Sequence, residues 1–289
     1  MGVTQRDTSK RKAKAGPAIA APLLYLYGVA ARVTKPRESG RFERCATDRT
    51  DPEASPWLLA SGVEEQVPVE AVDHGTVLAI VSRVPAADYE EEPLAGHLRN
   101  LSWVMERASR HNQVLVDLGA RMTILPCRFC TLFRHEDALR HASSERMTAI
   151  GKMLKRVAGR AEWAVKVYAV RPVEKKSTTS ASGAQYFTSL ARERAAERSA
   201  GQRARASIDT IVQSILEVTQ EVVPLELRQI ADGPTSDLIL NLACLVDRHQ
   251  ETALKRVLGD LTARGPELCI ALTFSGPLPP YSFVKDPLS

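Results

Sequence analysis

The sequence lacks any uninterrupted apolar stretch close to the ~20 residues that a membrane-spanning helix needs. This excludes an integral membrane protein built from such helices. Of the 289 residues, 44% are hydrophobic and 25% are charged, a composition that is typical of globular proteins and excludes a wholly disordered chain. The length suits about two domains with a sizeable buried core.

Cysteine is scarce and odd in number. Five cysteines do not look like a secreted disulfide framework, so we expect a reducing compartment. One feature favours secretion instead, because a basic start followed by the uncharged stretch 18–31 has the order of a signal peptide. Tyr25 and Tyr27 alternate with apolar residues in that stretch, which favours a first buried strand over 23–31.

Recognisable catalytic motifs are also lacking: there is no Gly-rich phosphate loop, nucleophile elbow or H-E-x-x-H motif. The strongest remaining cluster is Cys127-Arg128-Phe129-Cys130, followed by His135 and His141. Thiolates and imidazoles are zinc ligands, and a C-x-x-C pair can hold a reactive thiolate. However, the spacing gives a compact loop with little room to wrap a metal, and no helix clearly follows the pair. The alternative is two small apolar thiols in a buried segment.

Positive charge exceeds negative charge by only +5, and it is concentrated in two segments. Residues 1–16 carry a net +4 and residues 171–207 a net +5, which leaves −4 on the rest. The first segment is predicted to be a disordered tail over 1–17. The second contains arginines on a predicted long helix, namely Arg192, Arg194, Arg198, Arg203 and Arg205.

Those arginines could bind the phosphates of a nucleic acid. Glu193 and Glu197 are interleaved with them, and no aromatic residues alternate with them for base stacking. This pattern favours a solvated helix face or a face that contacts another protein.

Hydrophobic periodicity predicts the element order β-α-β-β-α-β in each half of the chain. Strands are predicted at 23–31, 67–73, 76–84, 122–126, 162–170, 225–231, 237–246 and 267–276. Helices are predicted at 53–60, 93–119, 136–158, 184–220 and 248–263. This order is typical of an α+β fold with helices on one face of an antiparallel sheet. We therefore predict two domains, 18–159 and 160–289, the second of them ferredoxin-like.

The last strand is followed by an unusual segment, Ser275-Gly276-Pro277-Leu278-Pro279-Pro280-Tyr281-Ser282-Phe283. Prolines fix φ and stiffen the chain. Tyr281 and Phe283 can then fold back as aromatic anchors. Two interpretations stay open, a rigid tail held on its own domain and a docking site for a partner.

Several short blocks, taken in order, resemble one family. They are LYLYGVA, LAIVSRVPAADY, HNQVL, TILPCRFCTLF, AEWAVKVY, SGAQYF and SGPLPPYSF, and they span about residues 23–284. In this order and spacing, the sequence resembles the gas vesicle protein L/F family (GvpL/GvpF). It departs from the family where Cys127 and Cys130 replace a leucine and a glycine, and where Leu278 replaces a tryptophan. The cysteine departure favours two structural thiols over shared chemistry.

The resemblance implies two α+β domains, a ferredoxin-like second domain and a first strand over 23–31. It implies a cytoplasmic, non-enzymatic protein that is a minor vesicle component or an assembly factor, and that binds the hydrophobic shell protein GvpA and other accessory proteins. We expect no cofactor, metal, membrane or nucleic acid partner. The residues proposed to contact partners are Arg128, Phe129, Arg192, Arg194, Arg198, Pro279, Pro280, Tyr281 and Phe283.

Overall fold

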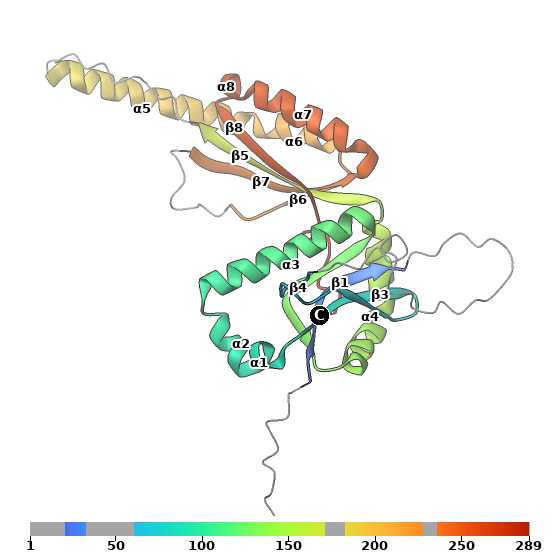
Figure 1. Ribbon diagram of the computed structural model, residues 1–289. Helices are drawn as coiled ribbons and strands as arrows, with labels where there is room; N and C mark the ends of the chain where they lie inside the picture. The colour runs from blue at the N-terminus through green and yellow to red at the C-terminus, as the bar shows by residue number, and fades with distance from the viewer. Residues whose placement is uncertain (1–20, 33–60, 171–182, 228–235, 289) are drawn as a thin grey trace, which may run out of the picture.

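Two four-stranded antiparallel sheets form the centre of the protein, as a computed structural model shows (Figure 1). The structure describes residues 21–32, 61–170, 183–227 and 236–288. The predicted tail over 1–17 and the predicted helix over 53–60 lie outside these residues. Each sheet packs against helices, which confirms the prediction of an α+β fold.

The first sheet has the strand order β2-β3-β1-β4. Its strands are β1 (Leu23–Ala31), β2 (Glu70–Asp73), β3 (Val77–Val84) and β4 (Ile124–Phe133). Its helices are α1 (Ala86–Tyr89), α2 (Glu91–His97), α3 (Leu101–Arg121) and α4 (Glu136–Val157). Helices α3 and α4 lie on opposite faces of this sheet (Figure 1).

Strand β1 is buried almost throughout because both of its faces are covered. Tyr25 and Tyr27 point toward α3 and pack with Leu115, whereas Leu24 and Leu26 pack in a second cluster on the α4 side. The prediction of helices on one face is therefore wrong for this sheet. A near-continuous apolar strand fits burial on both faces, which the alternation of aromatic residues alone does not reveal.

The second sheet has the strand order β6-β7-β5-β8. Its strands are β5 (Arg160–Val170), β6 (Glu221–Pro224), β7 (Ser236–Asp247) and β8 (Ile270–Leu278). Its helices are α5 (Gly183–Ala206), α6 (Ile208–Leu216), α7 (Glu251–Ala263) and α8 (Gly265–Leu268), with a short 3-10 helix at Arg248–Gln250. The core lies between the sheet and these helices. Counting adjacent helices as one, the element order is β-α-β-β-α-β, whereas the term ferredoxin-like stays a prediction.

Two predicted helices are each broken into two. The helix predicted over 93–119 is split into α2 and α3 because Asn100 caps α3, its Oδ1 accepting hydrogen bonds from the backbone N–H groups of Ser102 and Trp103 at 3.1 and 3.3 Å. The helix predicted over 184–220 is interrupted at Ser207 and ends at Leu216. The Asn100 side chain competes with an unbroken helix by capping α3, whereas the Ser207 hydroxyl donates to the Ala204 carbonyl at 2.7 Å. Hydrophobic periodicity alone detects neither interaction.

Three predicted strands also differ from the structure. Strand β4 does not end at Pro126 but continues to Phe133. It is an edge strand, where a missing N–H is tolerated. Of the strand predicted over 225–231, residues 225–227 are not in a strand and the rest lie outside the described residues, while β6 precedes it at Glu221–Pro224. The last strand starts at Ile270, after the short helix α8, and not at residue 267.

Candidate functional site

The C-x-x-C segment forms a bulge on the outer strand of the first sheet. Leu26 of β1 pairs with Thr131, and Gly28 pairs with Pro126, so residues 127–130 lie opposite Tyr27 alone. Cys130 has a φ of 60°, in the left-handed region. Such a bulge turns the strand locally and removes its backbone from regular pairing.

Buried polar groups hold this bulge in place. The hydroxyl of Tyr25 accepts a hydrogen bond from the Cys130 N–H at 3.2 Å and lies 2.9 Å from Nδ1 of His111. The His111 ring also hydrogen-bonds the backbone of Cys127. Burial lowers the pKa of His111 to about 4, so the ring is neutral near pH 7. Helix α3 therefore fixes the bulge through a histidine in its interior.

The two thiols of this segment are poorly suited to chemistry. Burial raises the pKa of both, that of Cys130 to about 11. His135 caps α4 by accepting a hydrogen bond from the Ala138 N–H at 3.1 Å, and His141 lies 3.4 Å from Glu145. The described part of the chain gathers no group of three or more potential metal ligands.

Slow alkylation of Cys130 is the expected result of this environment. At pH 8 a thiol with a pKa near 11 has about 100-fold less thiolate than one with a pKa near 9. Peptide-level mass spectrometry after brief iodoacetamide treatment measures the rate, and the same protein in urea provides the control. Labelling of Cys130 as fast in the folded as in the unfolded protein would contradict this prediction.

Arg128 and Phe129, two of the predicted site residues, point in different directions. The Arg128 side chain is 77% exposed and its Nε lies 3.4 Å from a carboxylate oxygen of Asp286. Phe129 packs edge-on against Tyr25 and His111, with ring centroids 6.5 and 5.9 Å apart. Of these two residues, only Arg128 is exposed on the surface of this bulge, where it pairs with Asp286.

The proline-rich tail lies against both sheets. Pro279 and Pro280 are buried, and Phe283, which is only 3% exposed, packs on Ala243 and Leu245 of β7. Farther along, Val284 and Leu288 pack against the α4-side core of the first sheet. The tail follows a strand of one sheet and contributes to the core of the other.

Polar contacts fix the same tail. The carboxylate of Glu162 accepts hydrogen bonds from the Ser282 N–H at 2.7 Å and from its hydroxyl at 2.8 Å. Arg156 of α4 donates to the Phe283 carbonyl at 3.1 Å and pairs with Glu221. The hydroxyl of Tyr281 donates to Oδ1 of Asn112 at 3.1 Å. Of the four predicted tail residues, only Tyr281 is substantially exposed.

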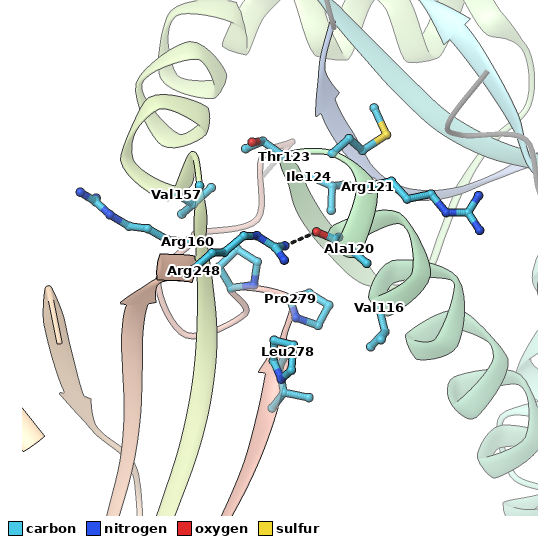
Figure 2. A pocket seen from close by; sticks show the side chains of 15 residues that line it. Val116, Ala120, Arg121, Thr123, Ile124, Val157, Arg160, Arg248, Leu278 and Pro279 are labelled. Carbon is cyan, nitrogen blue, oxygen red and sulfur yellow. Dashed lines mark hydrogen bonds between the residues drawn. The ribbon is translucent and has the colours of Figure 1, made fainter. Parts of the chain in front are cut away.

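A cavity of about 330 Å³ lies where the two sheets meet. It is lined by the C-terminal end of α3, by Arg160 and Arg248, and by residues 277–280. Figure 2 shows Arg248 reaching toward the end of α3, where it donates a hydrogen bond to the Gly119 carbonyl. Arg160 pairs with Asp247 at 2.9 Å. The Arg248 contact joins the second half of the chain to α3, whereas the Arg160–Asp247 pair links neighbouring strands of the second sheet.

The predicted basic helix is α5, whose N-terminal part extends well beyond the second sheet (Figure 1). Arg192, Arg194 and Arg198 are exposed there, and so is Glu197. The structure does not bring these arginines together with Arg128 or the tail into one site. They remain a separate candidate surface.

Sequence reasoning missed an exposed apolar surface at the junction of α2 and α3. Leu101 and Met105, four residues apart on one helix face, are 71% and 63% exposed, and Leu98 is exposed at the bend before them. We call these three residues the α2–α3 patch. Their helical spacing predicts a buried face, but the buried face of α3 consists of His111, Val114, Leu115 and Leu118. In the sequence, only Asn100, a residue type that favours the start of a helix, indicates that the helix is interrupted before Leu101.

None of the helices in the described ranges is long and apolar enough to cross a membrane.

Two solved structures have a similar fold. The crystal structure of the gas vesicle protein GvpF from Anabaena sp. PCC7120 aligns with a TM-score of 0.59 and 17% sequence identity, over 92% of this chain and 97% of that one. GvpF from Microcystis aeruginosa aligns with a TM-score of 0.59 and 15% identity, over 91% and 99% of the two chains.

Sequence comparison with known proteins gives the family. Gas vesicle protein L of Streptomyces sp. (strain CB03234) is 28% identical over 226 residues, 75% of this chain and 83% of that protein. Gas vesicle protein F of the same strain is 27% identical over 233 residues, 75% of this chain and 88% of that protein. The family model described as "Gas vesicle synthesis protein GvpL/GvpF" matches residues 23–285, nearly the whole chain. The chain therefore belongs to the GvpL/GvpF family of gas vesicle proteins.

Proposed function

We propose that this protein is a non-enzymatic gas vesicle accessory protein that binds the hydrophobic shell protein and other accessory proteins while the vesicle is nucleated. It acts in the cytoplasm and on the vesicle, as an assembly factor or a minor component. Support comes from the family match over residues 23–285 and from the structural contacts that His111 makes with Tyr25 and Glu162 makes with Ser282.

The α2–α3 patch is the observation that carries this proposal. Large apolar side chains exposed together on a folded protein are typical of protein-binding surfaces. A methionine adapts its shape to a partner, because its side chain is unbranched and flexible. A shell subunit with a large apolar surface aggregates unless that surface is covered before assembly. Contact with Leu101 and Met105 would cover part of it.

Charged residues would contribute on other surfaces. Arg128 on the β4 bulge and Arg192, Arg194 and Arg198 on α5 are exposed, so each can reach an acidic group of an accessory protein. Glu197 is exposed among the α5 arginines, and a mixed-charge face of this kind suits a protein better than a nucleic acid. The buried residues of the tail, Phe283 in particular, would support the fold and not touch the partner.

Co-purification with the shell protein tests the proposal. Exchange of both Leu101 and Met105 for aspartate is expected to reduce the recovered shell protein at least about tenfold, because two apolar side chains would no longer be buried on binding. The matched control is Leu227→Asp, which changes another exposed apolar residue and is expected to leave recovery unchanged.

Two outcomes would count against different parts of the proposal. Full recovery with the doubly substituted protein would move the binding surface away from the α2–α3 patch. No association of the unaltered protein with the shell protein, together with normal vesicles in a deletion strain, would reject the assembly function itself.

A further inference from the structure

The outer strands of the two sheets differ in how they are protected against pairing with another chain. An exposed strand edge presents unpaired N–H and C=O groups, and proteins usually block it with charge, proline, a bulge or short length. Strands β2 and β6 have four residues each; β2 carries Glu70 and Asp73, and β6 carries Glu221 and Pro224. Strand β4 contains Pro126 and the bulge at 127–130. Three of the four edges are therefore blocked.

Strand β8 has none of these devices along most of its length. Its nine residues, Ile-Ala-Leu-Thr-Phe-Ser-Gly-Pro-Leu, include no charged side chain, and its first proline is Pro277. It pairs with β5 on one side and is the last strand of its sheet. Ala271, Thr273, Phe274 and Ser275 are exposed. Residues 270–276 thus form a long, neutral edge that is open among the described parts of the chain.

We propose that two copies of this protein associate through their β8 edges, with the strands antiparallel and Thr273 on the twofold axis. The two second sheets then become one continuous antiparallel sheet. Twofold dimers are the commonest protein assemblies, and they require a surface that is complementary to itself. An antiparallel pair of identical strands satisfies this condition whenever its side chains match across the axis.

The side chains of β8 match in this register. With Thr273 opposite its own copy, Leu272 lies opposite Phe274 and Ala271 lies opposite Ser275, while Pro277 falls outside the paired segment. Phe274 and Leu272 are on the helix-covered face, where Phe274 lies 6.3 Å from Trp163 between ring centroids and is still 41% exposed. Leu272 of the second copy would cover the Phe274 ring. Apolar cross-strand pairs of this kind stabilise sheets.

The absence of charged side chains on β8 favours a second copy of this protein, and not a different chain, as the partner that pairs with its edge. The edge carries no charge that would select a partner of opposite sign, and self-pairing brings no like charges within the strand into contact. Pairing an unrelated strand would need a sequence that matches Leu272 and Phe274, which β8 itself supplies. This argument is independent of binding to the shell protein, which the α2–α3 patch would perform.

Light scattering coupled to size-exclusion chromatography tests the pairing. The chain has a mass of 31.7 kDa, and the unaltered protein is expected to elute with twice that mass at micromolar concentrations. Thr273→Lys is expected to give the single-chain mass, because two ammonium groups would face each other across the axis, near Lys166 of β5, which lies opposite Thr273. Thr210→Lys on α6, also at an exposed threonine, is the matched control and keeps the doubled mass.

A charge-swap mixture makes the test specific to the register. Thr273→Glu protein mixed with Thr273→Lys protein is expected to recover the doubled mass, since a carboxylate then faces an ammonium group at the axis. Recovery also demonstrates that the Thr273→Lys protein is folded. A single-chain mass for the unaltered protein, a doubled mass for Thr273→Lys alone, or a mixture that stays at the single-chain mass would each overturn the proposal.

Discussion

Replacement of Gly28 by alanine is expected to lower the free energy of unfolding by about 2–3 kcal/mol. Gly28 lies in the central strand β1, opposite Pro126 at the edge of the β4 bulge. A Cβ atom there would lie 2.4 Å from the Leu125 carbonyl oxygen and 3.1 Å from Cγ1 of Ile124. The nearer group belongs to the backbone of the paired strand, so relief requires β4 to move away from β1.

A second glycine provides the control, with an effect of opposite sign. Gly151 is inside α4, and a Cβ atom there would meet nothing within 4 Å. Gly151→Ala is expected to raise the free energy of unfolding by up to about 1 kcal/mol, because alanine favours the helix. Urea unfolding followed by circular dichroism measures both changes. Equal stability of the two variants would show that β4 does not pack against Gly28 as described.

Replacement of Phe283 by alanine is expected to cost about 3 kcal/mol, because it leaves a cavity in a well-packed site. Phe283 is 3% exposed and fills the space beside Ala243 and Leu245, on the face of the second sheet opposite its helices. Thermal or urea unfolding measures the loss. The matched change on the same tail is Tyr281→Phe, which removes one hydroxyl and its 3.1 Å hydrogen bond to Asn112 and is expected to cost about 1 kcal/mol.

This comparison separates two roles for the tail. If Phe283 acts in the fold, its removal lowers stability, and any loss of partner binding follows from that. A protein with Phe283→Ala that is as stable as the unaltered chain but fails to bind the shell protein would assign Phe283 to the partner interface instead.

The sequence predicted best those elements whose pattern is local. The strand predicted at 76–84 is observed at Val77–Val84, and the helix predicted at 136–158 at Glu136–Val157. The strand is a nearly continuous apolar run that is buried almost throughout, and the helix has one apolar face that matches its observed burial. Predictions of strand length and of side-chain burial failed where they depend on packing against a distant part of the chain. Pro126 continues a strand because β4 happens to be at the sheet edge, and Leu101 is exposed because α3 buries only its C-terminal half.

The sequence indicates which residues are candidates for the site, but not which of them are buried or which lie close together. The tail residues were recognised as an unusual motif, yet their pattern did not show that Phe283 would be buried beside β7 while Tyr281 stayed at the surface. The pair between Arg128 and Asp286 joins segments that no local pattern connects. Because such contacts depend on how the two sheets meet, the prediction of separate domains at 18–159 and 160–289 also depends on geometry that sequence alone does not contain.

The path of the tail has a consequence for the order in which the protein forms. Strand β1 and helices α3 and α4 leave the ribosome before the second sheet does, but Val284 and Leu288, which pack partly buried against the core between the first sheet and α4, are made only after the whole second sheet. The first half therefore reaches its final packing after the second half has been translated. During synthesis, the part of the α4-side core that Val284 and Leu288 cover therefore stays exposed until the tail is made.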